Sequence, residues 1–272
     1  MSTPAPAATP GGPRRRKPPR LVEVVSVSPV SARLISVLVT GDELDGFADA
    51  APTSHLKVFL PVEGEDAPNL PAPGPDGRPV PLEGPPPVVR TYTPRRYDPA
   101  TRTLEIQFLL HGTGPASEWA QRAKPGDKLA VAGPGGRFSL EPAAAHWWLA
   151  ADESAIPAVG TLLEALPETV AADVHLEVDG PDDEVEFTAP AKTTISWHHR
   201  RPDAFGVELL AAAHAASIPE GSRVWVACEA AAMRDIRRYF LTSRLLPPAS
   251  LVTRGYWRAG EQNHPDHDYG ED

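Results

Sequence analysis

The hydrophobic pattern of this chain changes near residue 142, and this change limits the possible folds more than any other feature. Before it, six apolar or alternating runs of strand length are separated by Pro and Gly, with one short helical stretch at 116–124. Several short strands with almost no helix between them predict a small antiparallel β-barrel. The expected strands are 21–27, 32–40, 55–60, 88–93, 104–110 and 128–132.

Two details of the first half support the barrel. Leu104, Ile106 and Phe108 alternate with more polar residues, which is typical of a strand with one buried face. Residues 62–87 are dense in Pro and Gly, which interrupt both helices and sheet ladders. We therefore expect a long surface loop there.

Beyond residue 142, strands alternate with longer helices, which predicts a mostly parallel sheet covered by helices. The expected strands are 146–151, 173–178, 193–197, 223–228 and 251–257, and the expected helices are 155–166, 205–217 and 231–245. Ligands of such sheets bind at the carboxyl ends of the strands. The loops that begin at Asp152, His198 and Glu229 are therefore the places to look for a site.

The length of the chain fits two domains. A chain of 272 residues with 41% hydrophobic residues can bury a sizeable core and is long for a single domain. We expect a β-barrel at 21–141 and an α/β domain at 142–260. A basic, Pro-rich arm at 1–20, expected to be disordered, and an acidic tail at 261–272, expected to fray, flank them.

Composition excludes several classes of function. The single cysteine, Cys228, cannot pair within the chain and offers no cysteine cluster or zinc site, which favours a reducing compartment. Neither a secretory signal nor an apolar run of membrane-spanning length is present, so we expect a soluble, cytoplasmic protein. We also expect a monomer. Residues 21–272 carry a net charge of −15, which argues against nucleic-acid binding. No metal-binding histidine motif and no serine-hydrolase motif occurs.

Two short motifs in the first half could carry chemistry. Arg90 and Tyr92 end an expected strand and share a face, so they could present a cation and an aromatic ring to one ligand, with the Thr93 hydroxyl beside them. Further on, the glycine-containing segment 111–117 leads into a helix, whose free N–H groups favour a pyrophosphate. The alternatives are a plain surface strand and a turn that uses glycine only for its geometry.

Taken together, the motifs resemble those of the siderophore-interacting protein family of ferredoxin-reductase-like flavoproteins, in the same order and with similar spacing. The resemblance runs from about residue 21 to 260. The matching segments are Arg90-x-Tyr92-Thr93, His111-Gly112 with Gly114-Pro115-Ala116-Ser117-x-Trp119-Ala120, Pro125-Gly126-Asp127, Gly133-Pro134-Gly135-Gly136, Ala151-Asp152-Glu153-Ser154-Ala155-Ile156-Pro157-Ala158 and Gly255-Tyr256-Trp257-Arg258-x-Gly260.

The resemblance implies where FAD would bind. Arg90, Tyr92 and Thr93 would hold the isoalloxazine ring and a phosphate of FAD. His111, Gly112, Gly114 and Ser117 would line the flavin and the pyrophosphate.

It also implies a nicotinamide site in the second domain. Asp152, Glu153 and Ser154 would open a helix at the end of a strand, where Ser154 could cap N–H groups and meet the nucleotide, although two acids would repel its pyrophosphate. Tyr256 and Trp257 could cover the flavin or belong to the core.

Three further residues are candidates for the site. Cys228 could lie near the reacting rings or be a small buried residue. Arg200 and Arg201 follow a strand and could contact a 2′-phosphate.

The function that the resemblance implies is the reduction of ferric siderophores by electrons that pass from NAD(P)H to FAD. Reduction weakens the grip of hard oxygen ligands on the iron and releases it. The flavin would carry the chemistry, so no catalytic side chain and no resident metal is expected, and Lys57, Arg137 and Arg258 would attract the anionic chelate. Alternatives are a reductase for another acceptor, a supply of electrons from ferredoxin, and a flavin-containing carrier without turnover.

Overall fold

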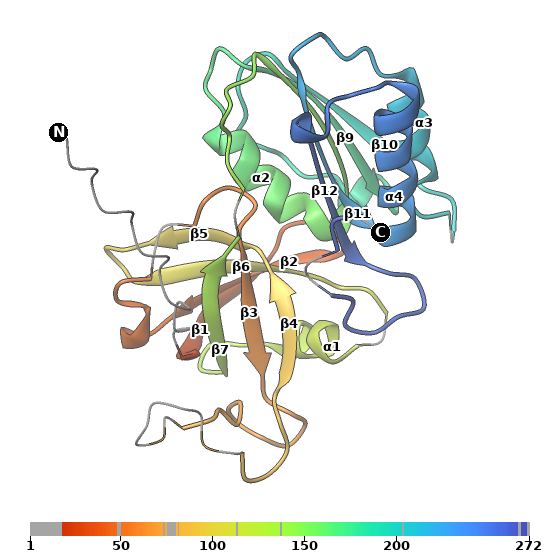
Figure 1. The fold of residues 1–272 in the computed structure, drawn as a ribbon. Helices are drawn as coiled ribbons and strands as arrows, with labels where there is room; N and C mark the ends of the chain where they lie inside the picture. The colour runs from red at the N-terminus through yellow and green to blue at the C-terminus, as the bar shows by residue number, and fades with distance from the viewer. Residues whose placement is uncertain are drawn as a thin grey trace, which may run out of the picture.

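The chain folds into two domains in the computed structural model (Figure 1). The structure describes residues 18–47, 50–72, 74, 80, 82–112, 114–136, 138–202, 204–265 and 268–270. An antiparallel sheet forms the first domain and a parallel sheet the second, as the change of hydrophobic pattern predicts. The predicted basic arm falls mostly on residues 1–17, which lie outside the described residues.

Seven antiparallel strands make up the first domain, in the spatial order β4-β3-β7-β1-β2-β6-β5. They are β1 (Arg20–Pro29), β2 (Leu34–Thr40), β3 (His55–Leu60), β4 (Val88–Tyr92), β5 (Pro94–Asp98), β6 (Thr103–Leu109) and β7 (Lys128–Gly135). Six were predicted. The sequence of β5, PRRYD, lacks an apolar alternation and gave no strand signal.

This sheet curls around its own apolar face. Alternate residues are buried in β3, in β6 and in the first half of β1; on β6, Leu104, Ile106 and Phe108 are fully buried, as predicted. The rings of Tyr92 on β4 and Phe108 on β6 lie 4.4 Å apart, so the first strand of the sheet approaches the last but one, as in a barrel. Helix α1 (Pro115–Arg122) contributes Trp119, whose ring lies 5.6 Å from that of Phe108. The Pro-rich segment between β3 and β4 contains no helix or strand among its described residues.

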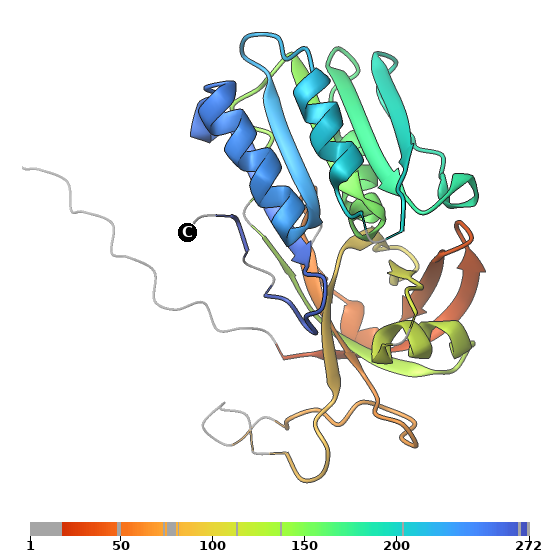
Figure 2. The same cartoon turned by 90° about the vertical axis from the view of Figure 1, so that its right-hand side faces the viewer.

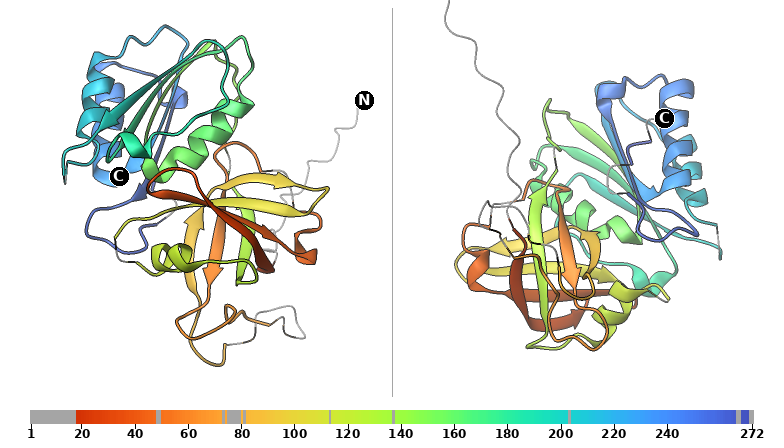
Figure 3. Two further views of the ribbon diagram at one scale, coloured as in Figure 1. Left: turned by 180° about the vertical axis from the view of Figure 1, so that it is seen from behind. Right: turned by 60° about the horizontal axis from the view of Figure 1, so that its bottom comes forward.

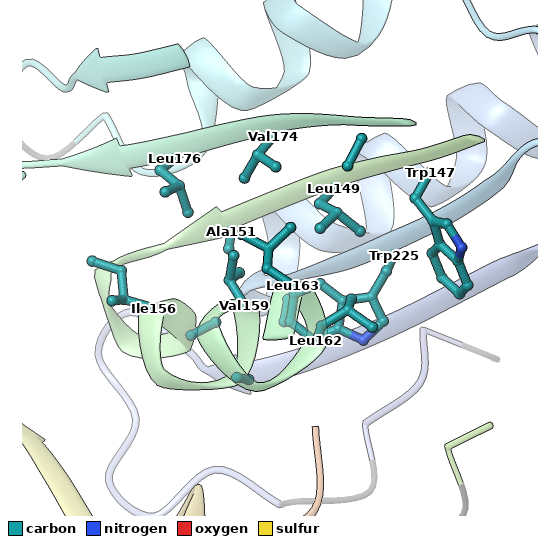
Figure 4. Close-up of a cluster of buried hydrophobic side chains, with 14 of the residues drawn as sticks. Trp147, Leu149, Ala151, Ile156, Val159, Leu162, Leu163, Val174, Leu176 and Trp225 are labelled. Carbon is teal, nitrogen blue, oxygen red and sulfur yellow. The ribbon is translucent and has the colours of Figure 1, made fainter. Parts of the chain in front are cut away.

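The second domain is a five-stranded parallel sheet with the order β10-β9-β8-β11-β12. Its strands are β8 (His146–Asp152), β9 (Ala171–Val178), β10 (Thr193–His199), β11 (Arg223–Glu229) and β12 (Leu251–Trp257). Helix α2 (Ile156–Ala165) packs on one face, with Trp147, Leu149 and Trp225 of the sheet (Figure 4). Helices α3 (Val207–Ala215) and α4 (Ala230–Arg238) cover the other face (Figure 2). A single π-helical turn, Tyr239–Ser243, continues α4.

Helix α2 lies between the parallel sheet and the barrel (Figure 3). Arg95 of β5 makes a bidentate ion pair with Glu164 of α2, at 2.6 and 3.0 Å. The N–H of Thr53 donates to Thr161 Oγ1 of the same helix at 3.0 Å. The two domains are therefore joined by specific polar contacts as well as by the chain.

Both predicted ends need correction. Arg20, assigned to the disordered arm, begins β1 and is nearly buried, with its guanidinium stacked over the Phe47 ring. The tail assigned to fraying packs instead: the N–H of Gly255 donates to the Asp268 carbonyl at 2.8 Å, and Thr253 Oγ1 donates to the Tyr269 carbonyl at 2.6 Å. These contacts join the tail to the free edge of β12, and the composition of the tail does not indicate which distant segment it will meet. None of the helices in the described residues is long and apolar enough to cross a membrane.

Candidate functional site

A cavity of about 700 Å³ lies between the two domains and is lined by both. This volume lies within the range of small-molecule and cofactor sites, which is roughly 300–1,000 Å³. The predicted residues that line it are Arg90, Tyr92, Thr93, His111, Gly114, Ser117, Glu153, Ser154, Arg200, Tyr256, Trp257 and Arg258. Gly112, Asp152 and Lys57 do not line it, and Arg137 lies outside the described residues.

Strand β4 provides one wall of the cavity. Arg90 and Tyr92 lie opposite Val58 and Leu56 across the β3–β4 ladder, which places both side chains on one face, as predicted. Burial raises the pKa of the Tyr92 hydroxyl far above its usual range, so it stays neutral. Thr93 of the barrel and Tyr256 of β12 both line the cavity, so the two domains meet at this wall.

The segment between β6 and α1 forms the next wall. Gly112 has a φ of +52°, a left-handed conformation that glycine adopts without strain. The N–H of His111 donates to Ser117 Oγ at 3.2 Å, so this hydroxyl closes the loop onto the helix. Burial, with Arg33 nearby, lowers the pKa of His111, which keeps its ring neutral. Because Gly114 precedes the first turn of α1, the free N–H groups of that turn begin at the cavity.

Several lining residues were missed in the sequence. Thr53, His55, Gln107 and Leu109 reach the cavity from the barrel. Gln107 and Leu109 alternate with the buried residues of β6, so the alternation shows that they face outward but not what they face. Only the packing of the second domain against this surface turns it into a cavity wall.

In the second domain, Asp152 caps the turn that leads into α2, and this corrects the prediction that Ser154 does so. Asp152 Oδ1 accepts hydrogen bonds from the Ser154 N–H at 3.0 Å and from its hydroxyl at 2.5 Å. Asp152 Oδ2 accepts from the Glu229 N–H at 2.9 Å and from Trp257 Nε1 at 2.7 Å. The carboxylate therefore ties together the ends of β8, β11 and β12 and fixes the indole of Trp257 at the cavity. It does not itself line the cavity.

The negative charge of Glu153 is neutralised by arginines. Glu153 pairs in bidentate fashion with Arg200, and Arg33 Nη1 lies 3.5 Å from Glu153 Oε1. Both arginines also reach Asp179, Arg33 at 2.5 Å and Arg200 at 2.9 Å. Arg33 comes from the turn between β1 and β2, so this cluster joins the two domains. It removes the expected repulsion at this position. Arg200 lines the cavity, and its side chain, which is 6% exposed, already pairs with Glu153 and Asp179.

The N-termini of the other helices on this sheet edge are also capped from within the chain. Glu229 accepts hydrogen bonds from the N–H groups of Ala231 at 2.7 Å and Ala232 at 3.0 Å, at the start of α4. Glu177 accepts from the N–H groups of Gly206 at 2.7 Å and Glu208 at 3.3 Å, at the start of α3. Cys228, next to Glu229, is fully buried outside the cavity, and its burial raises the pKa of its thiol, which fits a structural role.

The basic residues predicted to attract the substrate differ in their distance from the cavity. Arg258 lines the cavity, where its Nε lies 3.3 Å from Glu261 Oε1. Lys57 lies on β3 just outside it and donates to Thr91 Oγ1 of the neighbouring strand at 2.7 Å. Thr91 itself lines the cavity, so Lys57 is at its rim.

As a whole, the residues present fit a flavin dinucleotide. A tyrosine ring and a threonine hydroxyl stand at one wall, a glycine loop and a helix start at the next, and arginines lie between them. The first two suit a flat heterocycle and a pyrophosphate respectively, and forked guanidinium donors suit phosphate oxygens.

Comparison with known proteins agrees with this geometry. Residues 23–138 match the family model of the siderophore-interacting FAD-binding domain, and residues 144–260 match that of siderophore-interacting protein. The ferric vibriobactin reductase ViuB of Vibrio cholerae is 32% identical over 255 residues, which covers 92% of this chain and 93% of ViuB. An NADPH-dependent ferric-chelate reductase of Escherichia coli is 39% identical over 147 residues, 54% of this chain and 57% of that protein.

A solved structure is similar over almost the whole chain. The siderophore utilization protein from T. fusca superimposes with a TM-score of 0.83 at 34% identity, covering 93% of this chain and 98% of that one. The two family matches cover the barrel, the parallel sheet and the cavity wall up to residue 260. The chain therefore belongs to the siderophore-interacting protein family, with an FAD-binding domain followed by the family's second domain.

Proposed function

We propose that this protein is an FAD-dependent reductase that transfers electrons from NAD(P)H to the iron of a ferric siderophore. The observation that carries the proposal is the single cavity to which the flavin motif of the barrel and the carboxyl edge of the parallel sheet both contribute. A donor held by one domain and a flavin held by the other could meet there. The reductase names of the Vibrio and Escherichia relatives support the same activity.

The side chains of this protein would position the reaction. When bound, FAD accepts a hydride and can pass electrons on one at a time. Tyr92, Thr93 and Tyr256 would hold the flavin ring, and the helix start after Gly114 would hold the pyrophosphate. Trp257, fixed by Asp152, would cover the ring where the two domains meet. No side chain is required to move a proton, so positioning and the exclusion of water are the contribution of the protein.

Cations at the cavity would select the substrate. Arg258 and, at the rim, Lys57 would attract an anionic chelate, and Arg137 is proposed with them from the sequence. The iron is substrate: once reduced to Fe(II) it is held less tightly by hard oxygen ligands and leaves.

The identity of the electron donor is a separate part of the proposal. The Escherichia relative named as NADPH-dependent favours NADPH. One observation favours ferredoxin as a second candidate. In α/β domains the N–H groups at helix N-termini often bind the phosphates of a dinucleotide. Here Asp152, Glu177 and Glu229 already accept hydrogen bonds from such groups. We place the reaction in the cytoplasm and expect a monomer, which size-exclusion chromatography with light scattering would test.

Anaerobic absorbance spectroscopy tests the function. The purified protein loaded with FAD is expected to lose its yellow colour on addition of NADPH or NADH and to regain it on addition of a ferric catecholate, hydroxamate or citrate. Bleaching only by reduced ferredoxin would change the donor, and recovery only with a non-iron acceptor would change the substrate. A protein that binds the chelate but is never reduced would be a carrier, and the proposal would be wrong.

A further inference from the structure

The chain beyond β12 forms a wall of the cavity. Arg258 and residues 260–264 line it, and the loop that they form lies beside the barrel, next to β4 (Figures 1 and 2). After this loop the chain returns to the second domain, where residues 268–270 dock on β12 and α4. The acidic composition of this segment gave no sign of either contact.

Asp268 anchors the returning chain. Its carboxylate accepts hydrogen bonds from Arg234 of α4 at 2.9 Å and from the Gly270 N–H at 3.0 Å. A Cβ atom at Gly255 would stand 2.7 Å from Asp268 Oδ2, so the carboxylate fits only because residue 255 has no side chain. The anchor is thus built from three elements, namely β12, α4 and the tail.

The remaining partner of Asp268 is His264, whose side chain is only 6% exposed. His264 Nε2 donates to Asp268 Oδ2 at 2.8 Å. His264 Nδ1 is buried and has no hydrogen-bond partner among the described residues; the nearest ion-pair atom is Glu261 Oε2 at 3.6 Å, beyond hydrogen-bond length. Buried polar atoms are nearly always paired, and a carboxylate that holds one ring nitrogen of a histidine also fixes the direction of the other nitrogen.

We propose that His264, held by Asp268, contacts the adenosine half of bound FAD. This inference rests on the proposed function, because it takes the cavity as the FAD site. The wall at Tyr92 and Thr93 accounts for the flavin ring and the segment 111–117 for the pyrophosphate, which leaves the C-terminal loop for the adenosine. An imidazole nitrogen that carries no proton accepts a hydrogen bond, and adenosine offers an amino group and ribose hydroxyls as donors. A nearly buried group suits a resident cofactor better than a substrate that must leave.

The test compares FAD with FMN, which lacks the adenosine half. The His264→Phe variant keeps a ring of similar size but loses both nitrogens. Its FAD dissociation constant, measured by flavin fluorescence on the apoprotein, is expected to rise about 3- to 10-fold, the usual effect of one lost hydrogen bond. Its affinity for FMN is expected to equal that of the wild type. Asp268→Asn keeps the size of the side chain but weakens its hold on the His264 ring and its ion pair with Arg234. It is expected to act in the same direction and serves if His264→Phe does not fold.

The matched control is His199→Phe. His199 also donates to a carboxylate, Glu184 Oε1 at 2.8 Å, but lies outside the cavity, so both affinities should stay unchanged. An unchanged FAD affinity in His264→Phe, or equal weakening of FAD and FMN, would overturn the inference. If the wild type binds neither flavin, the proposed function itself fails, which is a distinguishable result.

Discussion

At the scale of single residues, Asp152 shows how one carboxylate can organise a site without facing it. Four donors from three chain positions converge on it, and Trp257 at the cavity is one of them. Burial, together with the neighbouring Glu153 carboxylate, raises the pKa of Asp152 to about 7. Its hydrogen bonds oppose that shift because they favour the ionised form.

This raised pKa leads to a prediction about stability. An unfolded Asp titrates near pH ~3.9, so between about pH 4 and 7 the folded chain binds this proton more tightly than the unfolded chain. The contribution of Asp152 to the free energy of unfolding is therefore fully present below about pH 4 and is lost as the pH rises through about 7. Urea denaturation at several pH values should show a slope, at most about 1.4 kcal/mol per pH unit, that Asp152→Asn lacks.

Asp45→Asn is the control for this experiment, because Asp45 is exposed. This variant should keep the pH dependence of the wild type. A slope in Asp152→Asn equal to that of the wild type would mean that Asp152 is already ionised across this range.

At the scale of elements, the helices of the second domain share one device: a carboxylate at the end of a strand caps a helix N-terminus. Asp152 does this at the turn before α2, Glu177 at α3 and Glu229 at α4. Glu177 belongs to β9 rather than to the chain just before α3, so this cap also joins two neighbouring elements. These edges are consequently fixed from within, before any ligand binds.

The cap of α4 can be tested by Glu229→Ala. Two N–H groups at the start of α4 and the N–H of Ala259 would lose their acceptor. A lost N-cap usually reduces the free energy of unfolding by about 0.5–2 kcal/mol. Because Glu229 is nearly buried, a value near the upper end is expected in chemical denaturation. The exposed Glu220, changed to Ala, should have an effect below about 0.5 kcal/mol. Equal effects of the two substitutions would show that the cap does not stabilise the helix.

At the scale of the whole molecule, the two domains are coupled. Arg33 of the barrel pairs with Glu153 and Asp179 of the second domain, and Arg95 pairs with Glu164. The cavity lies across the same junction. A ligand in the cavity should therefore stabilise both domains and not only the barrel.

Hydrogen exchange measures this coupling. At an FAD concentration about 100 times its dissociation constant, the most protected amides should exchange roughly 100-fold more slowly, in β1–β7 and in β8–β12 alike. Arg95→Met, which removes an ion pair between the domains outside the cavity, should reduce this effect in the second domain. Arg102→Met, which removes the exposed pair with Asp42 within the barrel, should not. Slowing confined to the barrel strands would contradict the coupling.

The order of elements and much of the barrel wall were determined by the sequence itself. Strand alternation and the spacing of Pro and Gly are local properties, so they predicted six of the seven barrel strands and the whole parallel sheet. The same local logic placed Arg90 and Tyr92 on one face and Gly112 in a turn.

Only the tertiary structure decided which charges and polar groups meet. Arg33 and Glu153 are 120 residues apart, and Gln107 faces a cavity that exists only after the domains pack. The tail was expected to fray because its composition is polar. In the structure Arg234 donates to Asp268, and the lack of a side chain at Gly255 leaves room for the Asp268 carboxylate. Composition and periodicity report the environment that a residue needs, whereas its partner is fixed only when distant segments come together.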